Sequence, residues 1–328
     1  MRRVSIVSAI MMALLVVMAA CSTSAPTGSE KPRAEGESSE LAAVDLAEGD
    51  RLEVVATTTI VADVVTNVAG EMAEVASLLP IGADPHAFTP APRDMAMLRD
   101  ADVIMANGAG LEEFLEDYIA SAGEGVPVVY LSDGITLRTF EPHEDDADSD
   151  AHEGADPHTW TSPANVMVFA RNAADALATL DPANAEAYQA NAEAYIAELA
   201  ELDRWVQEQL ATIPEEDRLL VSDHDVFGYY ADRYGLEQLG AIVPAFSSAA
   251  QPSARELADL QTAMREHGVK AVFVGTSVNS TVAERVAQDL GIEVVALYTG
   301  SLGEPGSGAE TYIDYTRYNT NAIVQALR

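Results

Sequence analysis

The feature that most constrains the fold of this chain is a repeated alternation of short β-branched segments with helical patterns. Strands that alternate with helices build parallel sheets whose two faces are both covered by helices. We therefore expect an α/β protein with two mainly parallel sheets. The expected strands cover 52–58, 74–79, 103–106 and 126–131 in the first half, and 219–222, 236–243, 269–274 and 292–297 in the second.

One long helical segment separates the two sets of strands. It begins at Asp181-Pro182, continues to about residue 211, and carries apolar residues at helical spacing. A helix of about 30 residues is roughly 45 Å long at 1.5 Å per residue, which is more than one small lobe requires. We expect an N-terminal α/β lobe (51–181), a linking helix (182–212) and a C-terminal α/β lobe (213–328).

The N-terminus has the features of an export signal. Arg2 and Arg3 precede an uncharged run over 4–20, which predicts a signal peptide over 1–20. The next residue is Cys21, the only Cys of the chain, and the segment MAAC at 18–21 resembles the bacterial lipobox. We expect Cys21 to carry lipid and to hold the exported protein at the outer face of the cytoplasmic membrane. The alternative is an ordinary signal peptide with an incidental Cys.

The segment that follows the signal has a composition that does not favour folding. Residues 21–50 are mostly Ser, Thr, Ala, Gly, Pro and Glu, and large apolar residues are scarce before Leu41. Such a segment buries too little surface to fold alone, so we expect a flexible tether. A single Cys also excludes an internal disulfide, so the folded part must be stabilised by its core.

The charge of the chain restricts its partners. The sequence has 53 Asp and Glu residues against 18 Lys and Arg residues, a formal net charge of −35. Nucleic acid is strongly negative and would be repelled, so we exclude it as a partner. Cationic ligands, including metal ions, suit this charge, although solubility alone can also explain it.

Three of the six histidines are expected to meet between the lobes. His86 and His158 each end an Asp-Pro-His tripeptide, and His224 follows the expected strand 219–222. In open parallel sheets, ligands bind beyond the carboxyl ends of the strands. Imidazole is the usual ligand of Zn²⁺, Cu²⁺ and Ni²⁺, and each bound His usually needs an outer partner such as a carboxylate. The sequence therefore predicts a metal site, with outer partners among the nearby acidic residues Asp84, Asp156, Asp223 and Asp225.

From residue 52 onward the chain resembles a known family, the metal-binding lipoproteins of zinc and manganese ABC importers (cluster A-I, ZnuA/TroA type). The resemblance implies two lobes on one long rigid helix, with His86, His158 and His224 as metal ligands. It also implies a binding protein without enzymatic activity, expected to be a monomer, that serves a permease and its cytoplasmic ATPase. The matching segments are GADPH (82–86), DPHTWTSP (156–163), HDVFGYY (224–230), RYGL (233–236), QPSA (251–254), SVN (277–279) and YTGSLG (298–303).

Two positions depart from the pattern of this family. Gly300 stands where relatives commonly supply an Asp as the fourth ligand, and Gly275 stands where acidic residues are frequent. Three alternatives are open at the fourth position. Water completes the shell, a carboxylate from Glu304, Glu310 or the acidic loop 141–154 reaches the metal, or the site binds more weakly. An Asp in place of Gly300 is expected to tighten binding if the pocket is otherwise intact.

The ligand types favour zinc over manganese. Manganese prefers oxygen ligands, whereas zinc accepts several imidazoles. The manganese-type relatives tend to carry carboxylates at the third and fourth positions, where this chain has His224 and Gly300. Zinc-type relatives often have a His-rich acidic loop, and loop 141–154 contains His143 and His152. These two histidines either gather zinc or belong to a plain solvated loop.

Two other functions remain as alternatives. Three histidines with an open position also describe hydrolytic zinc sites, but nothing here resembles a general base beside a substrate pocket. The second alternative is an adhesin or scaffold whose metal site is degraded. The chain contains no Gly-x-x-x-x-Gly-Lys-[Ser/Thr] loop, so a transport function needs a separate ATPase.

Overall fold

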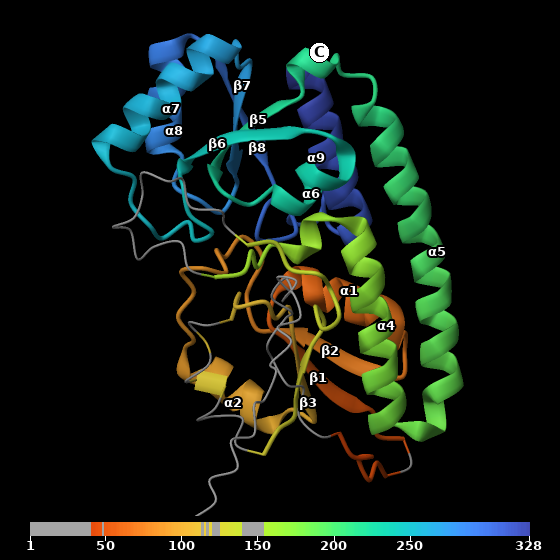
Figure 1. Cartoon of the computed structure of the whole chain (residues 1–328). Coiled ribbons are helices and arrows are strands. Elements are labelled where there is room, and N and C mark those ends of the chain that lie inside the picture. Colours follow the sequence, from red (N-terminus) through yellow and green to blue (C-terminus); the bar gives the residue numbers. More distant parts are fainter. Residues whose placement is uncertain (1–40, 48, 113–114, 116–117, 120–124, 140–153) are drawn as a thin grey trace, which may run out of the picture. The chain divides into compact units, whose positions relative to one another are not determined.

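The computed structural model describes residues 41–328, apart from 48, 113–114, 116–117, 120–124 and 140–153. The described residues form two four-stranded sheets in which all paired strands are parallel. The first sheet has the order β2-β1-β3-β4 and the second has the order β6-β5-β7-β8 (Figure 1). The strands are β1 (Leu52–Ala56), β2 (Ala73–Ser77), β3 (Val103–Ala106), β4 (Val128–Tyr130), β5 (Leu219–His224), β6 (Glu237–Val243), β7 (Ala271–Gly275) and β8 (Glu293–Leu297).

Helices connect the strands and cover the sheets, as the alternation predicts. The α-helices are α1 (Thr59–Ala69), α2 (Pro92–Asp100), α4 (Pro163–Leu180), α5 (Ala185–Leu210), α6 (Gly228–Tyr234), α7 (Ala254–His267), α8 (Thr281–Leu290) and α9 (Tyr312–Leu327). Short 3₁₀ turns among the described residues accompany them, namely η2 (Thr159–Thr161), η3 (Pro182–Asn184) and η4 (Glu215–Asp217). The helix expected near 111–122 lies partly outside the described residues.

Local sequence signals set the ends of several helices. The Thr58 hydroxyl accepts a hydrogen bond from the backbone N–H of Val61 at the start of α1. Ser253 and Glu256 form a capping box at the start of α7. Such side-chain oxygens satisfy backbone donors that the first helical turn leaves unpaired. Gly268 ends α7 in the left-handed conformation, with φ 65°, which glycine adopts without strain.

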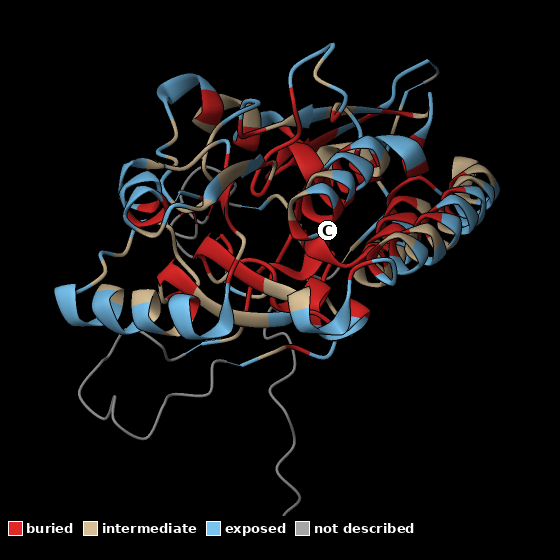
Figure 2. Ribbon diagram, turned by 90° about the horizontal axis from the view of Figure 1, so that it is seen from above, coloured by how far each residue is buried: buried red, intermediate tan, exposed pale blue. Residues whose placement is uncertain are grey.

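Helix α5 runs beside both sheets and joins them (Figure 1). It packs against α1 and α4 of the first half and against α6 and α9 of the second. Its buried face carries the apolar stripe that the sequence predicts, and its other face is exposed (Figure 2). The fold class is therefore confirmed as two parallel-sheet lobes joined by one long helix. The buried residues of α5 are Tyr188, Ala192, Tyr195, Leu199, Leu202, Val206 and Leu210.

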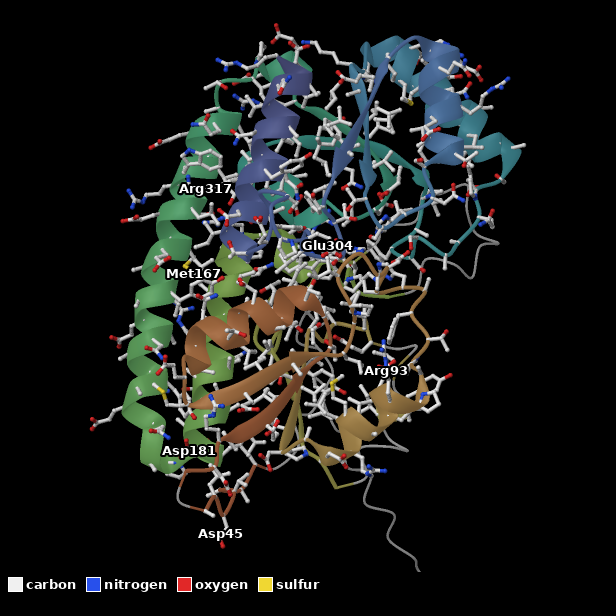
Figure 3. The ribbon with its side chains drawn as sticks, turned by 180° about the vertical axis from the view of Figure 1, so that it is seen from behind. Asp45, Arg93, Met167, Asp181, Glu304 and Arg317 are labelled. Atoms are coloured by element: carbon white, nitrogen blue, oxygen red, sulfur yellow. The ribbon has the colours of Figure 1, made fainter. Side chains whose placement is uncertain are left out.

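Packing of α5 continues into polar contacts at each end. Asp181 lies at the turn between α4 and α5 (Figure 3). Its carboxylate accepts a hydrogen bond from the hydroxyl of Tyr188 at 2.9 Å. Toward the other end, the guanidinium of Arg317 on α9 lies 5.0 Å from the ring centroid of Trp205. One hydrophobic cluster includes residues of α1, α4, α5 and α9, so both lobes pack on a shared helical layer. This arrangement favours small movements between the lobes over a wide hinge opening.

A partly buried carboxylate lies where α1, α5 and α9 meet. Asp63 of α1 accepts a hydrogen bond from the backbone N–H of Tyr312 at 3.0 Å and one from the Tyr195 hydroxyl at 3.5 Å. Burial raises the pKa of Asp63 to about 6, although both hydrogen bonds oppose this shift. The contact gives the helical layer a titratable group near neutral pH.

The N-terminal segments expected from the sequence lie mostly outside the described residues. This applies to the signal peptide 1–20, to Cys21 and to most of the tether 21–50. Residues 41–47 are described, and Leu41, Val44 and Leu46 pack against the core. The backbone N–H of Val44 also bonds to the carbonyl of Leu180 at 2.8 Å. The last part of the expected tether is therefore attached to the folded lobe, because its few apolar side chains find a place there.

In the part of the chain that the structure describes, no helix has both the length and the apolar character needed to span a membrane.

Candidate metal centre

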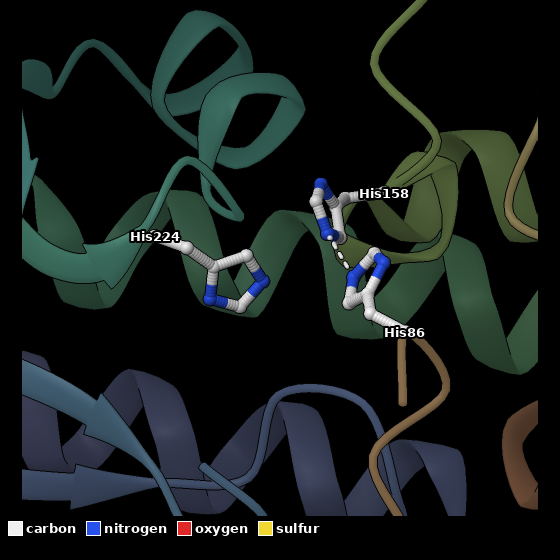
Figure 4. Close-up of side chains that lie close together, drawn as sticks. All are labelled: His86, His158 and His224. Carbon is white, nitrogen blue, oxygen red and sulfur yellow. Dashed lines mark hydrogen bonds between the residues drawn. The ribbon is translucent and has the colours of Figure 1, made fainter. Parts of the chain in front are cut away.

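The structure brings together the three histidines that the sequence singles out (Figure 4). His86 lies on the loop after β2, His158 directly precedes η2, and His224 is the last residue of β5. One ring nitrogen of each lies within 4.8 Å of the other two, and the Nε2 atoms of His86 and His158 are 3.1 Å apart. Nitrogens at about 2.0–2.1 Å from a tetrahedral Zn²⁺ lie roughly 3.3 Å from one another, so the spacing suits one ion.

The repeated Asp-Pro-His tripeptide fixes the backbone of two of these residues. Asp84 Oδ1 accepts the backbone N–H of His86 at 3.0 Å, and Asp156 Oδ1 accepts that of His158 at 3.0 Å. A side chain that bonds the backbone two residues further on forms a compact turn, and the intervening Pro restricts φ. The same local device therefore holds both imidazoles at the centre.

Carboxylates orient the two fully buried imidazoles. Asp156 Oδ1 accepts a hydrogen bond from His158 Nδ1 at 2.9 Å, and Asp223 Oδ1 accepts one from His224 Nδ1 at 2.7 Å. A carboxylate at Nδ1 places the proton there and leaves the Nε2 lone pair available for a metal. Of the four expected outer partners, these two bond imidazole through their carboxylates. The carboxylate of Asp84 also accepts from Ser248, and that of Asp225 accepts from Gln238.

The surroundings of the three rings set their protonation. Burial and the neighbouring imidazoles lower the pKa of His86 and His158 well below the usual histidine value. Burial opposes charge on His224 as well, but the hydrogen bond and charge of Asp223 outweigh it and raise the pKa of His224. His86 and His158 are therefore neutral near neutral pH and able to bind a cation. A cation that binds to the protonated form of His224 must displace its proton, so binding there weakens as pH falls.

Another buried carboxylate, which the sequence did not indicate, supports the loop of His158. Glu112 Oε1 accepts hydrogen bonds from the hydroxyl of Thr57 and the backbone N–H of Asn107, both at 2.7 Å. The Asn107 amide donates to the carbonyl of Pro157 at 3.0 Å and accepts from the Thr159 hydroxyl at 3.2 Å. Burial raises the pKa of Glu112. One sequence signal points to this network, since Thr57 and Asn107 directly follow β1 and β3, at the edge of the sheet where the strands end.

Apolar and small residues close the space around the histidines. Trp160 donates its indole N–H to the carbonyl of Thr299 at 3.0 Å, which ties η2 of the first half to the loop after β8. The hydroxyl of Thr299 is buried and has no hydrogen-bond partner among the described residues. The remaining lining residues are Asp84, Pro85, Val226, Ser277, Val278 and Gly300.

Gly300 lies against the loop that carries His86. A Cβ atom at residue 300 would come within 2.5 Å of Pro85 Cδ and 2.9 Å of Pro85 Cγ. Carbon atoms pack at about 3.5–4.0 Å, so an Asp in place of Gly300 requires Pro85 to move. The sequence-based expectation that such an Asp tightens binding stays a prediction, and this contact argues against it, because the pocket has no room for the side chain without a shift of the neighbouring ligand loop.

Gly275 has a related structural reason. Its backbone N–H donates to Asp223 Oδ2 at 2.6 Å, and Asp223 in turn orients His224. A Cβ at residue 275 would lie 2.2 Å from the Thr299 hydroxyl oxygen and 3.2 Å from Asp223 Oδ2. Glycine at the end of β7 therefore allows the close approach of Thr299, and it also leaves room for the carboxylate that holds the third histidine.

The acidic residues considered for the fourth position do not join the cluster in the described structure. Glu304 is exposed on the loop after β8 (Figure 3), and the carboxylate of Glu310 accepts from the backbone N–H of Gly306. Among the described residues, the metal-binding group found at this place consists of the three histidines alone. His143, His152 and nearly all of loop 141–154 lie outside the described residues.

Two parallel-sheet lobes on one long helix, with imidazoles from both lobes at one centre, define a metal-binding receptor. Residues 54–326 match the family described as ZnuA, "Zinc-uptake complex component A periplasmic", so the chain belongs to this family.

Characterised relatives carry both manganese and zinc in their names. The chain is 36% identical over 281 residues to the manganese-binding lipoprotein MntA of Halalkalibacterium halodurans, covering 85% of this chain and 90% of that one. It is 31% identical over 300 residues to the manganese ABC transporter substrate-binding lipoprotein PsaA of Streptococcus mitis, covering 86% and 91%. The periplasmic zinc-binding protein TroA of Treponema pallidum superposes with a TM-score of 0.74 at 26% identity, covering 85% of this chain and 99% of TroA.

A further solved structure shares the fold. The Mn-bound periplasmic metal-binding protein of Candidatus Liberibacter asiaticus gives a TM-score of 0.74 at 27% identity, covering 84% of this chain and 99% of that one. The protein is therefore a metal-binding, extracytoplasmic substrate-binding protein of the ABC importer type and not an enzyme. The names of these relatives include both manganese and zinc, so they do not identify the metal that this protein binds.

Proposed function

We propose that this protein captures one Zn²⁺ between its lobes and delivers it to an ABC importer. The observation that carries the proposal is the convergence of His86, His158 and His224 within 4.8 Å, with no carboxylate oxygen in that group among the described residues. Three nitrogen ligands suit zinc, which is commonly four-coordinate, better than manganese, which prefers oxygen ligands and higher coordination.

The outer contacts support a site built for a metal. Asp156 and Asp223 orient two of the imidazoles, and glycine at 275 makes room for one of these carboxylates. A degraded site would not need to retain this second layer of contacts, whose loss in metalloproteins typically lowers affinity by about 10–100-fold. These contacts favour a functional binding protein over an adhesin that has lost its metal.

The fourth position is proposed to be completed by solvent or by a group outside the described residues. Pro85 lies against Gly300 and leaves no room for a side chain there unless Pro85 moves. The bound ion is then delivered to a partner. We propose a permease with a cytoplasmic ATPase as that partner and a lipid on Cys21 as the anchor, with the protein itself a monomer.

Direct titration tests the proposal. Metal-free protein is titrated with Zn²⁺ and with Mn²⁺ by isothermal calorimetry, with a competing chelator where binding is tight. The proposal predicts one Zn²⁺ per chain and at least about tenfold weaker Mn²⁺ binding. A zinc dissociation constant weaker than about 10 µM, which is about −7 kcal/mol, would indicate a degraded site instead.

A further inference from the structure

Arg138 connects the two lobes through its guanidinium. Its Nη1 donates to Asp156 Oδ2 at 2.9 Å in the first half of the chain. Its Nε donates to Asp232 Oδ2 at 2.7 Å, and Asp232 belongs to α6 in the second half. The Arg138 side chain is 32% exposed, whereas the Asp156 side chain is fully buried. One cation is thus shared between a buried carboxylate and a carboxylate on the other lobe.

The guanidinium of Arg138 and the proposed ligand His158 bind to the same carboxylate, that of Asp156. Asp156 uses Oδ2 for Arg138 and Oδ1 for the Nδ1 of His158. A continuous chain of hydrogen bonds therefore links Asp232 on α6 to His158. Carboxylates bonded to a ligating imidazole set both its orientation and its basicity.

The same helix is held at a second point. The hydroxyl of Tyr229 accepts the backbone N–H of Arg138 at 3.0 Å and donates to the carbonyl of Asp156 at 2.9 Å. The guanidinium also lies 5.7 Å from the Tyr229 ring centroid. The segment of Arg138 is joined to that of Asp156 by an isolated bridge between Thr139 and Ala155. Helix α6 therefore docks on the two backbone segments that position His158.

Glycine at 228 makes this docking possible. A Cβ at Gly228 would lie 1.6 Å from Arg138 Nη1 and 2.7 Å from Asp156 Oδ2. A side chain at residue 228 would require the guanidinium of Arg138 to shift from this position. Glycine at 228 therefore leaves room for the guanidinium of Arg138 between α6 and Asp156.

We propose that Arg138 is a positioning residue that couples the approach of α6 to metal retention by His158. With Asp232 in place, the charge of Arg138 is shared, and Asp156 remains a strong acceptor for His158. When α6 moves away, Arg138 pairs with Asp156 alone, the Asp156–His158 bond weakens, and the imidazole holds the metal less firmly. This inference rests on the proposed function, since it explains how docking of the second lobe on a partner could release the ion.

The rate of zinc release tests the coupling. Protein loaded with Zn²⁺ is mixed rapidly with excess chelator, and the dissociation rate is measured for the full chain and its variants. Asp232→Asn removes the exposed carboxylate that shares the charge of Arg138. It is expected to speed zinc release about fivefold, which corresponds to the strongest interactions measured for exposed ion pairs. Arg138→Met removes the cation that competes with His158 for Asp156, so zinc release is expected to be no faster than in wild type and no longer to depend on Asp232.

Two further variants separate coupling from a merely structural role. Asp232→Glu keeps the charge and is expected to restore the wild-type rate. Asp203→Asn breaks the ion pair with Arg233, the residue next to Asp232 on α6, without touching the chain to His158. This control is expected to lower the melting temperature of the metal-free protein but to leave zinc release unchanged.

The outcomes decide between the ideas. Equal release rates for wild type and Asp232→Asn, or an equal acceleration by Asp203→Asn, would overturn the coupling. Because the two single changes act through one chain, the Arg138→Met/Asp232→Asn double variant is expected to release no faster than Arg138→Met alone. If wild type binds Mn²⁺ rather than Zn²⁺, the zinc proposal fails, and the same experiment with Mn²⁺ still tests the coupling.

Discussion

Substitution of Gly300 offers a test in which sequence similarity and structure predict opposite results. A comparison with relatives favours Gly300→Asp as the restoration of a missing ligand. The structure places the new Cβ 2.5 Å from Pro85 Cδ, about 1 Å closer than carbon atoms normally pack. Overpacking of this kind costs about 1–3 kcal/mol. Pro85 directly precedes His86, so the displacement falls on a proposed ligand.

The expected magnitude follows from that overlap. If about 1.4 kcal/mol of the cost is paid in the metal-bound state, zinc affinity falls about tenfold. We therefore expect Gly300→Ala to weaken zinc binding by about that factor, and Gly300→Asp not to bind more tightly than wild type. Calorimetric titration with a competing chelator at constant pH measures both variants. Thermal unfolding of the metal-free proteins reports whether each remains folded.

A double-variant cycle assigns the effect to the contact with Pro85. Pro85→Ala removes the ring atoms that the new Cβ would meet, so Gly300→Ala is expected to cost less in the Pro85→Ala background than in wild type. Tighter zinc binding by Gly300→Asp, by tenfold or more, would refute the steric argument. It would show that the loop of His86 yields easily and that the carboxylate ligates.

Three more predictions concern the histidines and the helical layer. His158→Ala is expected to weaken zinc binding by at least about 100-fold and His143→Ala by less than threefold in calorimetric titration, and equal losses would refute the ligand assignment. Zinc affinity is expected to fall as pH decreases through the raised pKa of His224, with about one proton released per ion, measured by calorimetry in buffers of different ionisation enthalpy; release of three protons would contradict the lowered pKa values of His86 and His158. Because the pKa of Asp63 is raised to about 6 in the folded state, its contribution to the stability of the metal-free protein is greatest below about pH 4 and is lost as pH rises to about 6. Asp63→Asn removes this contribution. Urea titrations measure the difference in unfolding free energy between variant and wild type, which is expected to change by at most about 3 kcal/mol between about pH 4 and pH 6. A difference that stays constant with pH would contradict the raised pKa of Asp63.

The alternation of strands and helices made the fold class predictable. The expected strand over 103–106 coincides with β3, and the apolar stripe of α5 was visible as a helical pattern. The proximity of His86, His158 and His224 could also be predicted, because parallel strands bring their carboxyl ends to one edge. Their role as ligands stays a prediction.

Contacts between distant segments could not be read from the sequence. Pro85 and Gly300 meet only because the loops after β2 and β8 come together, and no local pattern encodes that distance. The bond between Thr57 and Glu112 and the ion pair between Arg138 and Asp232 arise in the same way. Local propensity and periodicity describe elements one at a time, whereas these contacts depend on how the completed lobes pack.

Metal competition tests the central claim most directly. Metal-free protein is dialysed against equal concentrations of Zn²⁺ and Mn²⁺ at neutral pH, and bound metal is measured by mass spectrometry after removal of free ions. Three converging imidazoles predict one zinc and almost no manganese per chain. Retention of manganese in preference to zinc, or of neither ion, would contradict the account.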